Sequence, residues 1–321
     1  MYPQTVAAPH RKLYLRDLFA RLVKEKPLGL VGGIIVLLLL FVGIFANFIA
    51  PYGYNDIHLA YRLSPPSPNF LLGTDETGRD VLSRIVYGAR ISMVVGLAAT
   101  SISVILNVLI GTLSGYLGGK FDLVVQRFVD AWMCFPVMFI ILTMMGIVGQ
   151  GIAQVIVVMG VIYGITGSRI LRGAVMGLKQ DVYIQASVAV GSSTWRTLIR
   201  HILPNIMASV IILYTIGVGG MIMVEATISF LGFGVPPPIP SWGNMLSGTG
   251  RSYMLQAPGL ALWPGLALTL VVYGINMFGD AMRDLLDPRL RGGLGRYGKV
   301  KYKKIRPSGK YLKPQKEEPN M

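Results

Sequence analysis

The stretch LGLVGGIIVLLLLFVGIFANFIA, residues 28–50, runs for 23 residues without a charged side chain. A helix needs about 20 apolar residues to cross the hydrocarbon core of a bilayer, so this run is long enough to span it. The apolar core of a secretory signal peptide is shorter, about 7–15 residues, and precedes a small-residue cleavage site. Because this run is longer and is followed by PYGYND, it predicts a transmembrane helix that is retained in the protein.

Further charge-free runs follow, and the composition agrees with a membrane protein. Hydrophobic residues make up 53% of the 321 residues and charged residues only 14%, whereas soluble domains carry about 25%. The longest run, residues 131–168, contains GQG, which favours two short helices joined by a tight turn. The sequence therefore predicts an all-α polytopic membrane protein with six transmembrane helices, at about residues 28–50, 91–116, 131–148, 152–168, 204–228 and 260–281.

Lys and Arg are distributed unevenly about these six helices. Of the 30 Lys and Arg residues, 25 fall before helix 1, between helices 2 and 3, between helices 4 and 5, and after helix 6. Because basic residues accumulate on the cytoplasmic side, this predicts a multi-pass protein of the cell membrane with both termini in the cytoplasm. It also accounts for the net charge of +15 without nucleic acid as a partner.

The predicted transmembrane domain, residues 28–288, lies between two basic segments. Residues 1–27 place leucines on one helical face among basic side chains, as in a helix that lies on the inner leaflet. An ordinary charged lead-in to helix 1 explains this pattern equally well. The tail, residues 289–321, lacks apolar periodicity and suits a mobile cytoplasmic segment whose Lys residues contact anionic lipid.

Catalytic, metal and cofactor sites find no support in the sequence. The single cysteine, Cys134, excludes an intramolecular disulfide, and the three histidines are far apart, so no metal cluster is predicted. GLGRYGKV, residues 293–300, has the spacing of a phosphate-binding loop, but Val300 replaces the Ser or Thr that holds magnesium, and no strand precedes it. We therefore expect a transport subunit without an ATPase site or bound cofactor, not an enzyme.

A soluble-looking stretch, QASVAVGSSTWRTLIRHILPN at residues 185–205, interrupts the apolar runs between helices 4 and 5. Gly191 is placed to end a short helix in a left-handed cap, and the Ser and Thr residues after it offer N-cap oxygens for a second helix. The second helix carries one predicted apolar stripe, formed by Trp195, Leu198, Ile199, Ile202 and Leu203. Such a pair of helices either packs on the ends of the membrane helices or offers a knob to a groove in a partner protein.

This stretch resembles the cytoplasmic loop signature of ATP-binding-cassette (ABC) importer permeases, which is Glu-Ala-Ala, three residues, Gly, nine residues, and Ile-x-Leu-Pro. Here Gln185, Ala186 and Ser187 take the first positions, Gly191 takes the glycine position, and residues 201–204 the last, with both spacings kept. The sequence departs from the signature at Gln185, Ser187 and His201, where Glu, Ala and Ile are expected. A neutral Gln185 can hydrogen-bond but cannot make the charged contact that a glutamate could.

Three further motifs resemble the C-type permease subunit of dipeptide/oligopeptide importers: LLGTDETGRDVLSRIVYGARIS at 71–92, EATISFLGFGVPPPIPSWGNML at 225–246 and DAMRDLLDPRLR at 280–291. The resemblance implies the type I ABC-importer permease fold, with residues 179–204 as a coupling loop that docks into an ATPase subunit. It implies four kinds of partner besides the lipid bilayer: a second homologous permease subunit in a heterodimer, two ABC ATPase subunits that use ATP and Mg²⁺, and an extracytoplasmic peptide-binding protein.

The function implied by the resemblance is uptake of dipeptides or oligopeptides, driven by partner ATPases that switch the permease between inward- and outward-facing states. Permeases of the same family move glutathione or nickel complexes, so the substrate stays open among these. An ATP-independent secondary transporter or a polytopic enzyme is disfavoured, because the apolar runs contain few carboxylates or histidines and no protease motif. The residues implied in ATPase coupling are Gln185, Ala186, Ser187, Gly191, Trp195, Leu198, Ile202, Leu203 and Pro204.

Glu225 and Trp242 are the candidates for a gate or pathway. Ionisable groups inside a membrane cost about 2.5–3.5 kcal/mol and therefore point to function, although the position of Glu225 near the outer end of helix 5 lowers that cost. Trp242 lies in the proline-rich loop GVPPPIPSWGN. This loop either lines the outer gate, docks the binding protein or caps the bundle.

Two local patterns predict packing. Thr77 and Asp80 form a possible capping box that opens a helix lying along the outer membrane surface. Gly111, Gly115 and Gly119 recur every four residues, which predicts close packing between helices.

Overall fold

The computed structural model describes the backbone of residues 15–286 and the side chains of residues 20–286. Over these residues the chain consists of helices, turns and loops, with one isolated β-bridge between Thr74 and Asp80. The all-α prediction is therefore confirmed. The tail predicted at 289–321, with its GLGRYGKV motif, lies outside the described residues, as do residues 1–14.

Five helices in the described part of the chain are long and apolar enough to cross a membrane. A further pair, α5 and α6, meets at 85° and gives a sixth span if the pair is taken as one bent segment, which matches the six predicted helices. The five are α2 (Pro27–Ile44), α4 (Val81–Leu117), α7 (Ile152–Leu178), α10 (Leu203–Phe230) and α12 (Gly259–Leu286); the bent pair is α5 (Gly119–Met133) and α6 (Val137–Val148).

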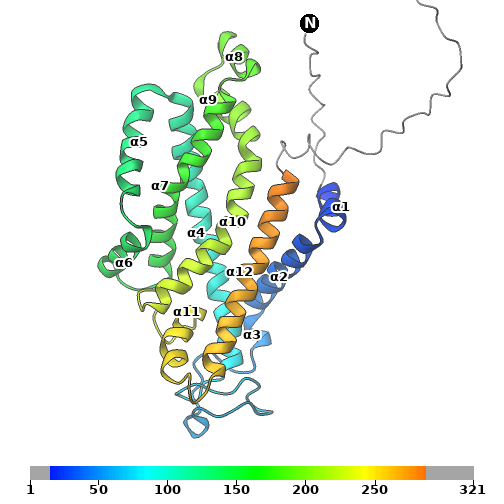
Figure 1. The fold of residues 1–321 in the computed structure, drawn as a ribbon, viewed down its shortest axis with the longest axis vertical. Helices are drawn as coiled ribbons and strands as arrows, with labels where there is room; N and C mark the ends of the chain where they lie inside the picture. Colours follow the sequence, from blue (N-terminus) through cyan, green and yellow to red (C-terminus); the bar gives the residue numbers. More distant parts are fainter. Residues whose placement is uncertain (1–14, 287–321) are drawn as a thin grey trace, which may run out of the picture. The chain divides into compact units, whose positions relative to one another are not determined.

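Short elements gather at the two ends of this bundle (Figure 1). At one end, called the hairpin end, lie α8 (Val182–Ala189) and α9 (Thr194–Thr197). At the other, called the loop end, lie the segment 51–80 and α11 (Trp242–Met245). The remaining elements are α1 (Leu15–Glu25), α3 (Ala46–Ile49), the 3₁₀ turn η1 (Leu59–Tyr61) and two π-helical turns, η2 (Leu198–Ile202) and η3 (Leu246–Gly250).

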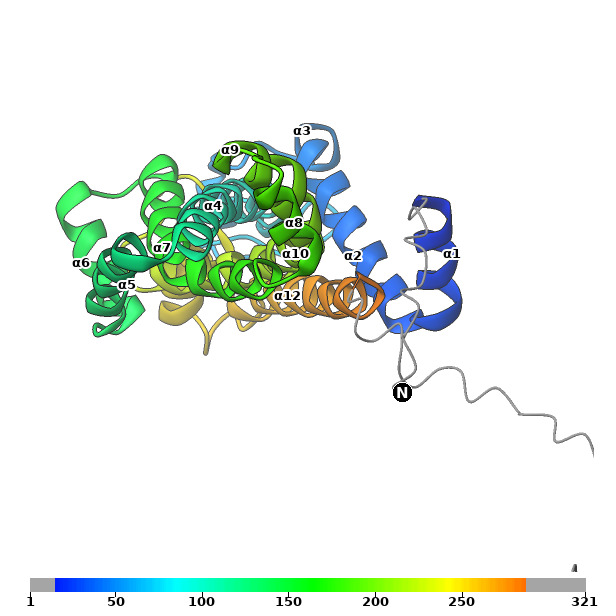
Figure 2. The same ribbon diagram turned by 90° about the horizontal axis from the view of Figure 1, so that it is seen from above.

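Helices α4 and α7 form the closest pair of the bundle and run side by side in both views (Figure 1 and Figure 2). A Cβ at Gly111 would lie 2.6 Å from the Ser168 carbonyl oxygen, and one at Gly115 would lie 2.8 Å from that of Arg172. Close packing is therefore confirmed at Gly111 and Gly115. Gly119 differs: it begins α5 with a φ of +56°, and no described atom outside its own neighbours lies within 4 Å of where its Cβ would be.

The start of α4 corrects two predictions. The helix begins at Val81, ten residues before the predicted start at 91, so the motif 71–92 does not form a separate surface helix. Asp80, and not Thr77, is the N-cap, since its carboxylate accepts the Ser83 N–H at 2.7 Å. The predicted capping box is therefore wrong.

Polar contacts explain why the helices continue through charged residues at which the predicted spans ended. Arg90, inside α4, donates to the Gly43 carbonyl oxygen at 2.8 Å. Arg172, inside α7, donates to both carboxylate oxygens of Asp122 on α5, at 2.7 and 2.6 Å. Because these charges have partners, α7 continues to Leu178 instead of ending at 168, and the loop expected before residue 131 is helix α5.

The helix predicted at 131–148 is broken near its start. Pro136 is the N-cap residue of α6 and separates it from α5. Proline lacks a backbone N–H and disfavours helical geometry in the residue before it. The chain therefore changes direction here and gives the 85° bend between α5 and α6.

Candidate functional site

The predicted helical pair lies at the hairpin end (Figure 1). α8 ends at Ala189, and Gly191 follows with a φ of +90°, the left-handed conformation predicted for it. Ser193 is the N-cap of α9, and its hydroxyl accepts the Arg196 N–H at 3.4 Å. The turn is open, since no atom of its described surroundings lies within 4 Å of where a Gly191 Cβ would be. Backbone conformation, and not crowding, therefore favours glycine here.

The second half of the hairpin is continuous with a membrane-spanning helix. α9 passes through η2 into α10 as one helical run from Thr194 to Phe230. The π-helical turn immediately precedes Pro204, in the first turn of α10, where the missing N–H cannot continue the α-helical ladder. A displacement of the hairpin can therefore be transmitted along α10 towards the loop end.

One side of the hairpin is packed on the bundle. Its apolar cluster joins α8, η2 and α7 and includes Ile184, Leu198, Ile202, Leu171 and Val175, with Leu203 half-buried at its edge. Burial of such side chains fixes the hairpin against α7 by packing. Leu198 and Ile202 therefore hold the hairpin in place and do not form its outer surface.

The other side exposes large apolar side chains, which we call the exposed hairpin face: Val182, Tyr183, Val188, Val190, Trp195 and Ile199. Val190 is 90% exposed and Trp195 is 65% exposed. The predicted stripe is thus divided between the buried cluster and this face, because only one side of the helix contacts α7. Contiguous exposed apolar side chains mark surfaces that contact another molecule.

The residues that replace the Glu-Ala-Ala signature lie on α8. Gln185 and Ala186 are exposed, and Ser187 is half-buried. The Gln185 side-chain amide donates to the Gln180 carbonyl oxygen at 3.1 Å. This local bond occupies an N–H of the Gln185 side-chain amide. The Gln185 side chain is itself uncharged.

Basic side chains border the exposed hairpin face. Arg196 and Arg200 are exposed, and neither has an ion-pair partner within residues 20–286. Burial, and secondly the Asp181 carboxylate, raise the pKa of the Tyr183 phenol, which therefore stays neutral at physiological pH. The surface is apolar with a basic border.

Glu225 lies at the far end of α10, fully buried. The Ser229 hydroxyl donates to Glu225 Oε1 at 2.6 Å and accepts the Val235 N–H at 3.2 Å. The buried Ser241 side chain also faces this carboxylate. Ser229 thus ties the segment between α10 and α11 to the end of α10, and Glu225 holds the Ser229 hydroxyl in place.

Trp242 is also buried and connects α11 to α4. Its indole N–H donates to the Ile85 carbonyl oxygen at 3.1 Å. The ring lies so close to α4 that a Cβ at Gly88 would be 2.9 Å from it. Glu225 and Trp242 are therefore contacts between elements of the loop end, and neither lines the cavity found there.

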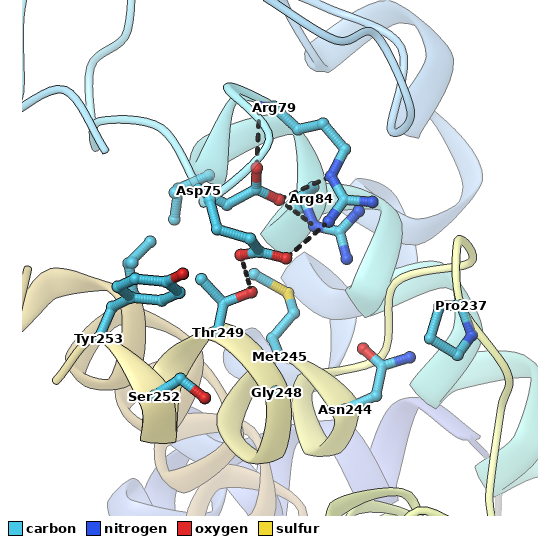
Figure 3. A pocket seen from close by; sticks show the side chains of 13 residues that line it. Asp75, Arg79, Arg84, Pro237, Asn244, Met245, Gly248, Thr249, Ser252 and Tyr253 are labelled. Carbon is cyan, nitrogen blue, oxygen red and sulfur yellow. Dashed lines mark hydrogen bonds and ion pairs between the residues drawn. The ribbon is translucent and has the colours of Figure 1, made fainter. Parts of the chain in front are cut away.

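A cavity of about 250 Å³ that was not predicted from the sequence lies between the loop before α4 and the α11–η3 segment (Figure 3). Asp75 pairs with Arg79 at 2.7 Å and lies 3.6 Å from Arg84. Glu76 pairs with Arg79 at 3.4 Å and accepts a hydrogen bond from the Thr249 hydroxyl. The acids and bases thus neutralise one another and tie this loop to η3. The alternation of acidic and basic residues in DETGRDVLSR was the sequence signal for these ion pairs.

The described part of the chain contains no group of three His, Cys, Asp or Glu side chains arranged to hold a metal ion. Cys134 is exposed at the junction of α5 and α6.

The chain is similar to known permeases over most of its length. A family model described as "binding-protein-dependent transport system inner membrane component" matches residues 107–292, and one described as "N-terminal TM domain of oligopeptide transport permease C" matches residues 14–66. The dipeptide transport system permease protein DppC of Alkalihalophilus pseudofirmus is 36% identical over 276 residues, which are 86% of this chain and 90% of that protein.

Two further relatives are named for other substrates. The oligopeptide transport system permease protein OppC of Bacillus subtilis is 36% identical over 268 residues, 84% of this chain and 88% of that protein. The glutathione transport system permease protein GsiD of Pectobacterium atrosepticum is 35% identical over 289 residues, 90% and 94% of the two proteins. This multi-pass membrane protein therefore belongs to the inner membrane components of binding-protein-dependent transport systems, among the C-type permease subunits of the dipeptide/oligopeptide importer family.

Proposed function

We propose that this chain is the membrane-spanning permease subunit of an ABC importer for dipeptides or oligopeptides, and that the exposed hairpin face docks into one of the ATPase subunits. The main support for the proposal is the arrangement of the hairpin at the end of the bundle. It presents an apolar surface beyond the helix ends, and the helix that carries Trp195 continues without a break to Phe230. A docked partner that moves therefore moves a membrane-spanning helix.

The two sides of the hairpin have different tasks in this mechanism. Trp195 and Ile199 contact the ATPase subunit, whereas Leu198 and Ile202 make the hairpin move together with α7 and α10. At the far end of α10, Glu225 positions Ser229, which holds the segment that leads to α11. We assign Glu225 to a linkage between α10 and the gate at the loop end. Trp242 belongs to the same linkage through α4. We assign neither residue to the lining of the translocation path.

The partners follow from the transport system to which the family belongs. A second homologous permease subunit forms a heterodimer with this chain, two ABC ATPase subunits bind and hydrolyse ATP with Mg²⁺, and an extracytoplasmic protein delivers the peptide. This chain contributes neither an ATPase site nor a cofactor site. The names of the relatives support a peptide substrate, and one of them supports glutathione as the second candidate.

The hairpin end faces the cytoplasm in this proposal, and the loop end faces outward. Residues 28–288 form the transmembrane domain, with 179–204 as the coupling loop and both termini in the cytoplasm. Arg196 and Arg200 at the hairpin end support this orientation, because basic residues accumulate on the cytoplasmic side.

Co-purification with the ATPase subunits in mild detergent tests the docking. Trp195→Glu places a charge on the exposed hairpin face without altering the buried cluster, so we expect the chain to insert normally but to lose the ATPases and ATP-driven dipeptide uptake. The matched control is Leu255→Glu, since Leu255 is 95% exposed near the start of α12. The control should keep the ATPases. Retention of the ATPases by Trp195→Glu would overturn the docking assignment.

Competing uptake of labelled dipeptide and labelled glutathione by the assembled importer tests the substrate. Saturable dipeptide uptake supports the proposal. Uptake of glutathione without dipeptide would replace the first candidate by the second.

A further inference from the structure

An apolar groove of about 490 Å³ lies between α4, α5 and α7. Nine side chains line it, and all are aliphatic or aromatic. α5 contributes Phe121, Val124 and Phe128 as exposed walls and Val129 as a buried floor, and α4 contributes the exposed Leu109. The groove is therefore an open apolar channel along one side of α5.

Ion pairs also hold α5 to α7. Asp122 binds Arg172 through two hydrogen bonds, and Asp130 pairs with Arg169. Both acidic residues of α5 are thereby used. Ion pairs thus anchor α5 to α7, whereas the apolar groove beside α5 is left unfilled.

Two cations on α5 remain without partners. Lys120 and Arg127 are exposed, and neither forms an ion pair with any residue that the structure describes. They are seven residues apart, so they lie two turns apart on one face of the helix. Val124 and Phe128, in the groove wall, flank this face at helical spacing. The apolar groove therefore has a positively charged border along α5.

We infer that this groove binds an acyl chain of an anionic phospholipid, with the phosphate held by Lys120 and Arg127. The charge of the border selects an anionic headgroup, and the wholly apolar lining selects a hydrocarbon chain. The bound lipid completes the packing of α5 against α4 and α7.

Native mass spectrometry of the purified protein tests the site, with phosphatidylglycerol and phosphatidylcholine of identical acyl chains as probes. We expect wild type to retain phosphatidylglycerol preferentially, by about fivefold for each cation. The double variant Lys120→Gln/Arg127→Gln should reduce phosphatidylglycerol to the level of phosphatidylcholine. Val125→Trp, which fills the groove, should reduce both lipids. The control Arg251→Gln removes an exposed cation near the loop end and should change neither.

Equal retention of the two lipids by wild type, or unchanged retention in the double variant, would overturn the inference. A second measurement does not depend on the folding of Val125→Trp. Photoreactive p-benzoylphenylalanine in place of Phe128 should cross-link to phospholipid when the assembled importer is illuminated in membranes. Cross-linking to the second permease subunit in place of lipid would show that a protein segment fills the groove, and would refute the lipid site.

Discussion

Gly243 determines how closely α11 approaches α10. A Cβ at this position would overlap the carbonyl oxygen of Ala226. The adjacent Trp242 donates to α4, so the first turn of α11 touches two membrane helices at once. Neighbouring Gly248 differs, because no atom of the described chain lies within 4 Å of where its Cβ would be.

Gly243→Ala should therefore destabilise the protein, whereas Gly248→Ala should not. Overpacking of a well-packed contact costs about 1–3 kcal/mol, and the rigid backbone oxygen of Ala226 cannot move aside as a flexible side chain can. Thermal unfolding in detergent measures the difference. Equal unfolding temperatures for the two variants would contradict the close contact between α11 and α10.

Single residues were predictable from sequence where a local rule applied. Gly191 was assigned a left-handed conformation from the end of one helical pattern and the start of another, and its φ is +90°. Gly243 offered no such signal, because its requirement comes from Ala226 on another element. Asp80 was taken as the third residue of a capping box, since sequence spacing alone does not say which of two polar residues is the cap.

Neighbouring residues in η2 show how one helical turn contributes to two surfaces. Leu198 is buried in the cluster with Leu171 and Ile184, whereas Ile199 is 63% exposed. The sequence placed both in a single stripe, because helical spacing shows which residues share a side but not how wide the contact with α7 is.

Leu198→Ala and Ile199→Ala should therefore separate stability from docking. Truncation of a buried leucine costs about 2–5 kcal/mol, so Leu198→Ala should lower the stability of the isolated subunit. Ile199→Ala should change stability by less than about 0.5 kcal/mol but weaken co-purification with the ATPases. Unfolding and co-purification measured on both variants check this division, and a reversed pattern would contradict it.

The attachment of α5 rests on its ion pairs. Arg172 donates to both oxygens of Asp122, and the two side chains are only partly exposed. Arg172→Gln should cost about 1–3 kcal/mol, between the values for exposed and buried pairs. We expect faster hydrogen–deuterium exchange in residues 119–133 and unchanged exchange in α12. Arg200→Gln is the control, since Arg200 has no ion-pair partner within residues 20–286, and equal exchange in both variants would refute the anchor.

The same ion pairs explain which element boundaries could not be predicted. Asp122 and Arg172 lie fifty residues apart, so the sequence around one residue does not show that the other neutralises its charge. The predicted spans therefore stopped at charged residues, while α4 and α7 continue about three turns beyond. Apolar content did not predict the helix break at Pro136 either, although proline is a local sequence signal for a break.

At the scale of the whole molecule, the bundle separates two ends of different chemistry. The hairpin end presents an apolar face bordered by Arg196 and Arg200, and the loop end contains neutralised ion pairs and buried contacts around Glu225. The number of spans could be predicted from the length of the charge-free runs and from the GQG break within the longest one, because the bilayer sets the length of a span. The placement of Glu225 and Trp242 in buried contacts could not, because it depends on how three elements meet.

Cysteine labelling tests the orientation of these two ends. In a Cys134→Ser background, we expect a membrane-impermeant maleimide to label Leu255→Cys in intact cells and Val190→Cys only after the membrane is opened. Both side chains are at least 90% exposed, so accessibility reports the side of the membrane and not burial. Labelling of Val190→Cys in intact cells would reverse the proposed orientation.

Photo-cross-linking from position 195 in the assembled importer tests whether the exposed hairpin face docks into an ATPase subunit. With p-benzoylphenylalanine in place of Trp195, the account predicts a cross-link to an ATPase subunit, with a yield that changes between the nucleotide-free and ATP-bound states. The same substitution at Leu255 should give no ATPase product. Cross-linking from position 195 only to lipid or within this chain would contradict the account, because the exposed hairpin face would then not be the surface on which the ATPases act.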